Sequence, residues 1–189
     1  MTRTFIAFEL DTAQQQFLGN IIRQGKLHLP DLRWVDPTSI HLTLAFLGEL
    51  DDEQVAKAIA AAQYAATSVN PFVYRLSGLG TFGQARQPRV LWMGISETSG
   101  SLEVVHQALD LALGQQGFVT EKRPFSPHLT LARIKSYLNP TQLQALQQLL
   151  SHYQFTSPAY HVARLSVMKS ELLRSGAQYT CLQACPLQK

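Results

Sequence analysis

Apolar and polar positions along this chain form two kinds of segment, short extended runs and longer stretches with helical spacing. The apolar residues Phe17, Leu18, Ile21 and Ile22 recur at helical spacing, and Asp11 is placed to cap the helix that contains them. The elements expected in the first half are a strand over residues 4–10, that first helix, a strand from His41 to Gly48, a helix from Asp51 or Asp52 to about Ala66, and a strand from Pro71 to Leu76.

The second half repeats this order. Positions 5 and 41 lie 36 residues apart and positions 90 and 128 lie 38 apart, so we infer an internal duplication, with approximate repeats over residues 1–80 and 88–189. The elements expected here are a strand from Val90 to Ile95, a helix around Leu102, Val105, Leu109 and Ala112, a strand from His128, a helix capped by Asn139 that carries Pro140, Leu143, Leu146 and Leu150, and strands over His161–Lys169 and Gln178–Ala184.

Together these elements predict an α+β fold in a single bilobal domain over residues 1–189. We expect two small, mainly antiparallel sheets backed by helices, with a central cleft where the two histidine strands meet. The stretch from Gly78 to Pro88 contains three glycines and is interpreted as a long hairpin loop between the halves.

Composition limits the classes of function. Apolar residues make up 46% of the 189 residues, charged residues 15%, and the net charge is +3. The mild basic bias suits an anionic ligand, whereas the absence of any run of five Lys or Arg argues against a protein that coats nucleic acid. Cys181 and Cys185 are interpreted as reduced thiols. The sequence shows neither a signal peptide nor a membrane span, so we expect a cytoplasmic protein with no membrane partner.

The tetrapeptide His-Leu-Thr-Leu occurs twice, at His41–Leu44 and His128–Leu131. Because side chains alternate along a strand, each copy sets an imidazole and a hydroxyl on one face and two leucines on the other. Two opposed imidazoles supply an acid and a base for breaking a phosphodiester, and the hydroxyls of Thr43 and Thr130 donate hydrogen bonds to phosphate oxygens. A metal site is the competing interpretation, but neither motif carries a third ligand at suitable spacing.

Two other features have weaker support. Arg133 follows the second motif and offers a cation to the phosphate, although strict alternation places it on the face opposite His128, so the strand must twist, bulge or end. Gly78, Gly80 and Gly83 spell the dinucleotide-binding pattern G-x-G-x-x-G. The residues after Gly83 lead into a strand instead of a helix, so we interpret this segment as a glycine-rich turn.

With both motifs identified, the chain resembles the 2H phosphoesterase superfamily, specifically its bacterial RNA 2′,3′-cyclic phosphodiesterase branch, also called 2′-5′ RNA ligase. The resemblance covers essentially the whole length. It rests on the strand from Arg3 to Phe8, the segments His41–Gly48 and Pro127–Arg133, the stretch Gly78–Gly83 with Pro88–Trp92, and the closing Ser170, Gly176 and Tyr179.

The resemblance implies hydrolysis of a terminal 2′,3′-cyclic phosphate on RNA to a 2′-phosphomonoester, without metal or cofactor. It makes His41 the proton donor to the leaving 3′ oxygen and His128 the proton acceptor that activates water, with Thr43 and Thr130 on the phosphate. The residues alone do not distinguish donor from acceptor. The expected substrates are RNA ends or cyclic nucleotides. The protein is expected to be a monomer. Two alternatives stay open: 2′-5′ ligation at the same site, and a non-catalytic module that binds RNA ends.

Overall fold

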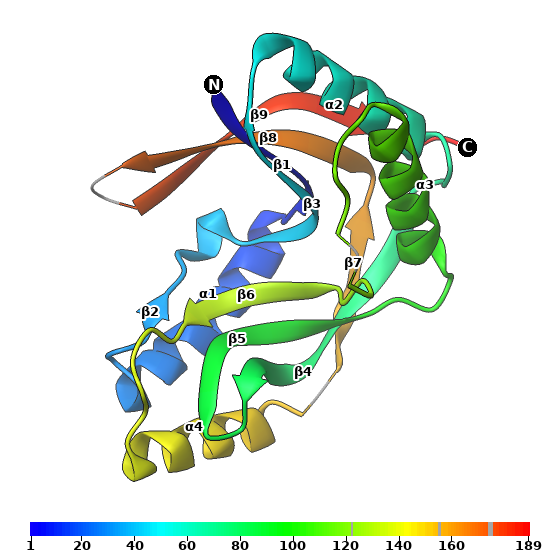
Figure 1. Ribbon diagram of the computed structural model, residues 1–189. Coiled ribbons are helices and arrows are strands. Elements are labelled where there is room, and N and C mark those ends of the chain that lie inside the picture. The colour runs from blue at the N-terminus through cyan, green and yellow to red at the C-terminus, as the bar shows by residue number, and fades with distance from the viewer. Residues whose placement is uncertain (122, 155, 174–175) are drawn as a thin grey trace.

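Two antiparallel sheets and the helices that cover them make up the molecule, as the computed structural model shows (Figure 1). It describes residues 1–121, 123–154, 156–173 and 176–189. The helices in these ranges are α1 (Thr12–His28), α2 (Asp52–Ala66), α3 (Ser101–Gln115) and α4 (Pro140–His152). The strands are β1 (Thr2–Glu9), β2 (Arg33–Trp34), β3 (His41–Leu50), β4 (Phe72–Gln84), β5 (Gln87–Ser96), β6 (His128–Arg133), β7 (Thr156–Val162), β8 (Arg164–Leu173) and β9 (Gly176–Pro186).

Each predicted histidine strand belongs to a different sheet. The four-stranded sheet has the order β3-β1-β8-β9 and is called the His41 sheet below. The five-stranded sheet has the order β2-β6-β5-β4-β7 and is called the His128 sheet. Strands β3 and β6 lie against one another, so the two histidine strands meet where the sheets meet, in the α+β, two-lobed arrangement that the sequence predicts.

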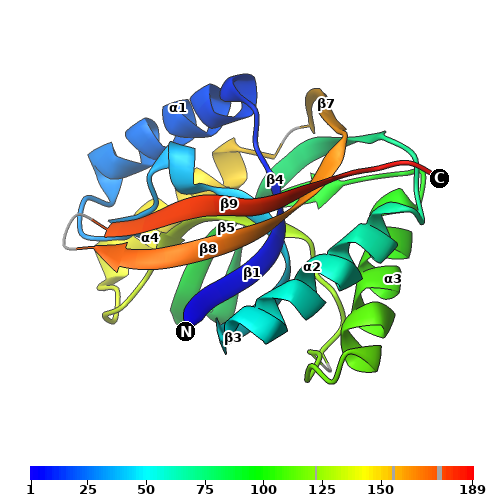
Figure 2. The same cartoon turned by 90° about the horizontal axis from the view of Figure 1, so that it is seen from above.

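Three of the helices begin where the sequence predicts. Asp11, Asp51 and Asn139 accept hydrogen bonds from the first turns of α1, α2 and α4, and a glutamine three residues later completes a capping box in each case. Figure 2 shows α1 on one side of the His41 sheet and the packed pair α2 and α3 on the other. The leucine faces of β3 and β6 join one hydrophobic core with these helices.

Two expectations about strands were wrong. Residues 161–169, expected to form one strand, belong to two: β7 ends at Val162 in the His128 sheet, and β8 begins at Arg164 in the His41 sheet. The apolar alternation shifts phase here, from Tyr160 and Val162 to Leu165 and Val167, but the pattern does not say which sheet each strand joins. Each sheet therefore draws strands from both halves of the chain.

Residues 78–88 form the expected hairpin, but its loop is short, not long. Strand β4 continues to Gln84 and pairs with β5 up to Gln87, which leaves a short turn between them. The glycines here have a packing role, because a Cβ at Gly80 would collide with the Trp92 ring. No helix follows Gly83 within this hairpin, which confirms that the segment is not a dinucleotide-binding turn. Strand β3 likewise continues past Gly48 to Leu50.

Candidate active site

His41 lies at the start of β3, on the face turned away from the core leucines. Its Nδ1 donates a hydrogen bond to the backbone carbonyl of Ser39 at 2.9 Å. The imidazole stacks on Phe5, with ring centroids 4.5 Å apart, and meets the edge of Tyr179 at 5.0 Å. Burial by these rings lowers the pKa of His41, and the hydrogen bond to Ser39 offsets part of that effect. The ring is thus held in an apolar environment that favours its neutral form.

His128 lies at the start of β6 and is held in the same way. Its Nδ1 donates to the backbone carbonyl of Ser126 at 2.7 Å. One aromatic ring, Phe82, stands perpendicular to the imidazole, with ring centroids 4.8 Å apart. In both motifs the carbonyl acceptor belongs to the residue two positions before the histidine. A carbonyl can only accept, so the neutral ring of each histidine carries its proton on Nδ1 and presents the Nε2 lone pair for chemistry.

A β-bulge interrupts each motif at its second leucine. On β3, Thr43 pairs with Ala7 and Ala45 with Ile6, so Leu44 has no partner across the ladder. On β6, Thr130 pairs with Trp92 and Ala132 with Leu91, so Leu131 is unpaired in the same way. An extra residue shifts the alternation of a strand and redirects the side chains that follow. The residue five positions after each histidine therefore returns to the histidine's face.

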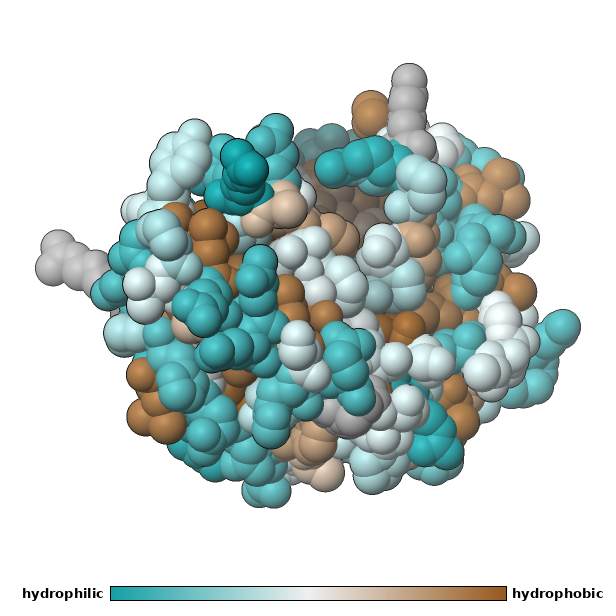
Figure 3. All heavy atoms as spheres, turned by 90° about the horizontal axis from the view of Figure 1, so that it is seen from below, coloured by the Kyte–Doolittle hydropathy of each residue, from teal (hydrophilic) through white to brown (hydrophobic). Residues whose placement is uncertain are grey.

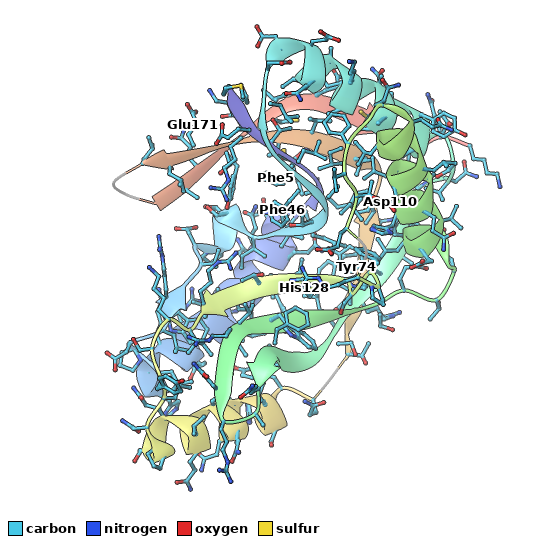
Figure 4. The ribbon with its side chains drawn as sticks, in the orientation of Figure 1. Phe5, Phe46, Tyr74, Asp110, His128 and Glu171 are labelled. Atoms are coloured by element: carbon cyan, nitrogen blue, oxygen red, sulfur yellow. The ribbon has the colours of Figure 1, made fainter. Side chains whose placement is uncertain are left out.

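In the first motif this returning residue is Phe46. It pairs with Phe5, with ring centroids 6.0 Å apart, and Phe5 in turn stacks on His41. Figure 4 shows Phe5 and Phe46 together on the lobe of β1 and β3, with His128 on the neighbouring lobe. Although it stands in an apolar stretch, Phe46 is 68% exposed. From the sequence, Phe46 could stack on a base, but aromatics beside a strand are usually core, so it was not among the predicted site residues.

In the second motif the returning residue is Arg133. Its partner on β5 is Val90, two positions before Trp92, so Arg133 shares the face of Thr130 and His128. The bulge at Leu131 meets the condition stated for Arg133, that the strand must twist, bulge or end to bring it to the face of His128. Its side chain is exposed and available to an anion beside the second motif.

Thr43 and Thr130 lie on the same faces as their histidines and are half-buried. Within the described residues, neither hydroxyl has a protein hydrogen-bond partner. Each is therefore free to donate to a bound group, as the sequence motif requires. The structure places all five sequence-predicted site residues on the two strands that meet, His41 and Thr43 on β3 and His128, Thr130 and Arg133 on β6.

Other parts of the molecule carry less chemistry. A hollow of about 620 Å³ lies against α3, lined by residues that include His106, Asp110 and Arg123 but none from the two motifs. Across the described chain, no three His, Cys, Asp or Glu side chains gather closely enough to hold a metal ion.

None of the described helices is both long and apolar enough to cross a membrane. Figure 3, which views the end where α4 lies, shows hydrophilic and hydrophobic residues intermixed over that face.

Comparison with known proteins extends over both motifs. A family model described as LigT-like phosphoesterase matches residues 11–92 and 94–179. The RNA 2′,3′-cyclic phosphodiesterase of Geobacillus stearothermophilus is 31% identical over 97% of this chain, which spans 56% of that relative's length. The enzyme of the same name from Aquifex aeolicus strain VF5 is 29% identical over 97% of this chain and 96% of its own. A solved structure from Thermus thermophilus has 25% sequence identity and a TM-score of 0.76, covering 98% of both chains.

Proposed function

This chain belongs to the LigT-like phosphoesterase family, and on that premise we propose that it hydrolyses the 2′,3′-cyclic phosphate at the end of an RNA strand. The products are a 2′-phosphomonoester and a free 3′ hydroxyl. The observation that carries the proposal is the matched pair of histidines, each with Nδ1 bound to a carbonyl and Nε2 left for proton transfer. Relatives that bear the name RNA 2′,3′-cyclic phosphodiesterase support the choice of substrate.

In the proposed reaction, His128 Nε2 takes a proton from a water molecule as its oxygen attacks phosphorus. The bond from phosphorus to O3′ breaks, and protonated His41 gives its Nε2 proton to the departing O3′. Thr43 and Thr130 donate hydrogen bonds to the non-bridging oxygens, and Arg133 balances the negative charge that grows on them. Phe46, exposed beside the first motif, offers a face on which the terminal base stacks.

The assignment of His41 as the proton donor rests on the family resemblance, because burial lowers its pKa and by itself favours the neutral ring. Product analysis tests which ester oxygen leaves. A 2′-phosphate product shows that O3′ departs, as proposed, whereas a 3′-phosphate product contradicts the assignment of the leaving oxygen.

Metal independence is part of the proposal. With excess chelator, the purified protein should hydrolyse adenosine 2′,3′-cyclic phosphate at an undiminished rate. Loss of turnover that zinc restores would instead support the metal-dependent alternative.

Ligation at the same site is the second candidate. The attacking group is then the 5′ hydroxyl of another RNA, whose proton His128 takes in place of a proton from water. Incubating an RNA with a cyclic-phosphate end and an RNA with a 5′-hydroxyl end, then comparing joined with hydrolysed product, separates the two reactions. A non-catalytic module would bind these RNA ends and release them unchanged.

A further inference from the structure

Arg33, from the short strand β2, lies next to the proposed phosphate site. Strand β2 pairs with the end of β6, and the register sets Arg33 directly opposite Arg133. Side chains directly opposite across antiparallel strands share a face, with Cβ atoms about 4.5–5.5 Å apart. Because Arg133 shares the face of His128 and Thr130, Arg33 lies on that face as well. Both arginine side chains are exposed.

No carboxylate balances these two charges in the described part of the chain. The ion pairs found there involve Lys57, Arg123, Arg164 and Lys169, and neither Arg33 nor Arg133. The acidic residues nearest to Arg33 in sequence have other partners: Asp31 accepts from Gln142 at 3.1 Å, and Asp36 accepts from the backbone and hydroxyl of Thr38. Like charges directly opposite one another destabilise a strand pair. The pairing of Arg33 with Arg133 therefore calls for an anionic ligand.

We infer that Arg33 binds a second phosphate of the substrate, the phosphodiester that precedes the terminal nucleotide of an RNA strand. This inference rests on the proposed function, since Thr43, Thr130 and Arg133 hold the cyclic phosphate there. Strand β2 extends the sheet outward from β6, so Arg33 is one strand farther than Arg133 from the β5 side of the site. A cyclic mononucleotide has no phosphate to place at Arg33, whereas an RNA strand has one. The enzyme should accordingly favour RNA ends over mononucleotides.

The experiment compares two substrates, adenosine 2′,3′-cyclic phosphate and the dinucleotide ApA with a 2′,3′-cyclic end. Arg33→Gln should lower kcat/KM for the dinucleotide by about tenfold, as expected for a lost charged hydrogen bond, and leave the mononucleotide unchanged. Arg33→Lys should keep most of the dinucleotide rate, because an ammonium still neutralises a phosphate. Arg23→Gln, an exposed arginine on α1, is the matched control and should change neither rate.

A binding measurement follows the same contact without relying on turnover. Fluorescence anisotropy of a labelled RNA with a cyclic-phosphate end, titrated across salt concentrations, should show the log–log salt slope reduced in size by about 0.7 in Arg33→Gln, the value for one phosphate contact on a single strand. An equal loss on both substrates, or no loss on either with an unchanged salt slope, overturns the inference. Failure of the parent protein to hydrolyse either substrate counts against the proposed function instead, and the salt slope still decides the role of Arg33.

Discussion

The His41 strand and the His128 strand start alike and end differently. Both contain His-Leu-Thr-Leu, both hold the histidine Nδ1 on a carbonyl two residues earlier, and both bulge at the second leucine. The residue that each bulge returns to the histidine face is an aromatic in one lobe, Phe46, and a cation in the other, Arg133. His41 is also enclosed by two aromatic rings, whereas one ring edge contacts His128.

This difference makes the surroundings of the two otherwise matching motifs unequal. Two identical motifs offer no reason for a substrate to bind one way round. On the proposed function, the exposed aromatic beside one motif binds the base of a nucleotide and the guanidinium beside the other binds its phosphate. Burial also lowers the pKa of His41, the histidine that the aromatic rings enclose. The following changes test whether the lobes divide the work in this manner.

Removing either imidazole should have the largest effect. We expect His41→Ala and His128→Ala each to lower kcat for a cyclic nucleotide by about 10²- to 10⁴-fold, the usual contribution of one acid or base. The double variant should lose little more than either single one, because the two residues act in one step. His161→Ala, an exposed histidine on β7, controls for the loss of an imidazole elsewhere. If one variant folds and turns over at the parent rate, that histidine has no chemical role.

Arg133 should come next. Arg133→Ala should lower kcat/KM by about 10- to 100-fold, since a hydrogen bond to a charged group contributes about 1.5–3 kcal/mol. Arg133→Lys should restore only part of the rate, because an ammonium cannot make two parallel hydrogen bonds to a phosphate. Arg86→Ala, in the turn between β4 and β5, is the control. Full activity in Arg133→Ala would mean that the guanidinium is a solvated charge at the strand end.

Phe46 tests the other side of the comparison. Phe46→Ala should raise KM by about 5- to 100-fold, because stacking contributes about 1–3 kcal/mol per base. Phe46→Tyr keeps a ring and should behave like the parent. A cyclic phosphate on an abasic ribose should not distinguish Phe46→Ala from the parent. An equal loss on that substrate would assign Phe46 to the packing of β3 and not to base binding.

The smallest effect concerns pH. A proton donor must carry its proton, so the rate should fall as pH rises through the pKa of His41, which burial holds below its ordinary 6.5. Tyr179→Ala admits water to the ring, raises that pKa and should move this alkaline limb of kcat/KM to higher pH. Tyr179→Phe keeps the enclosure and should leave the limb in place. If the alkaline limb stays at the same pH in Tyr179→Ala, the limb does not report the titration of His41.

The same burial predicts a change in stability. The unfolded chain binds a proton at His41 more readily than the folded protein does, so the free energy of unfolding should fall as pH drops through 6.5. His41→Phe should weaken this acid sensitivity in denaturant titrations at pH 5 and 7. If the free energy of unfolding falls equally with pH in the variant and the parent, groups other than His41 cause the fall.

Sequence reasoning could name the candidate reactive residues because the pattern that marks them is local. Asp11, Asp51 and Asn139 cap helices through contacts three residues away, so these boundaries could be predicted. The histidines and threonines needed no more than strand alternation. Arg133 was proposed, with a bulge as one condition for it to reach the site, whereas Phe46 was not among the predicted site residues. A bulge at the second leucine brings each of them to the histidine face. The signal that sequence reasoning missed is that both stand five positions after a motif histidine. The matched bulges also support the internal duplication, which stays a prediction.

The sequence by itself determined most of the helices and strands, the paired motifs proposed to carry the chemistry, and the family to which the chain belongs. These depend on side-chain spacing, caps and composition, which act over a few residues. The tertiary structure alone decided where the bulges at Leu44 and Leu131 fall, that the chain changes sheets at Ala163, and that Arg33 lies opposite Arg133. Each depends on the register between strands far apart in sequence, and register is set by the packing of the whole core.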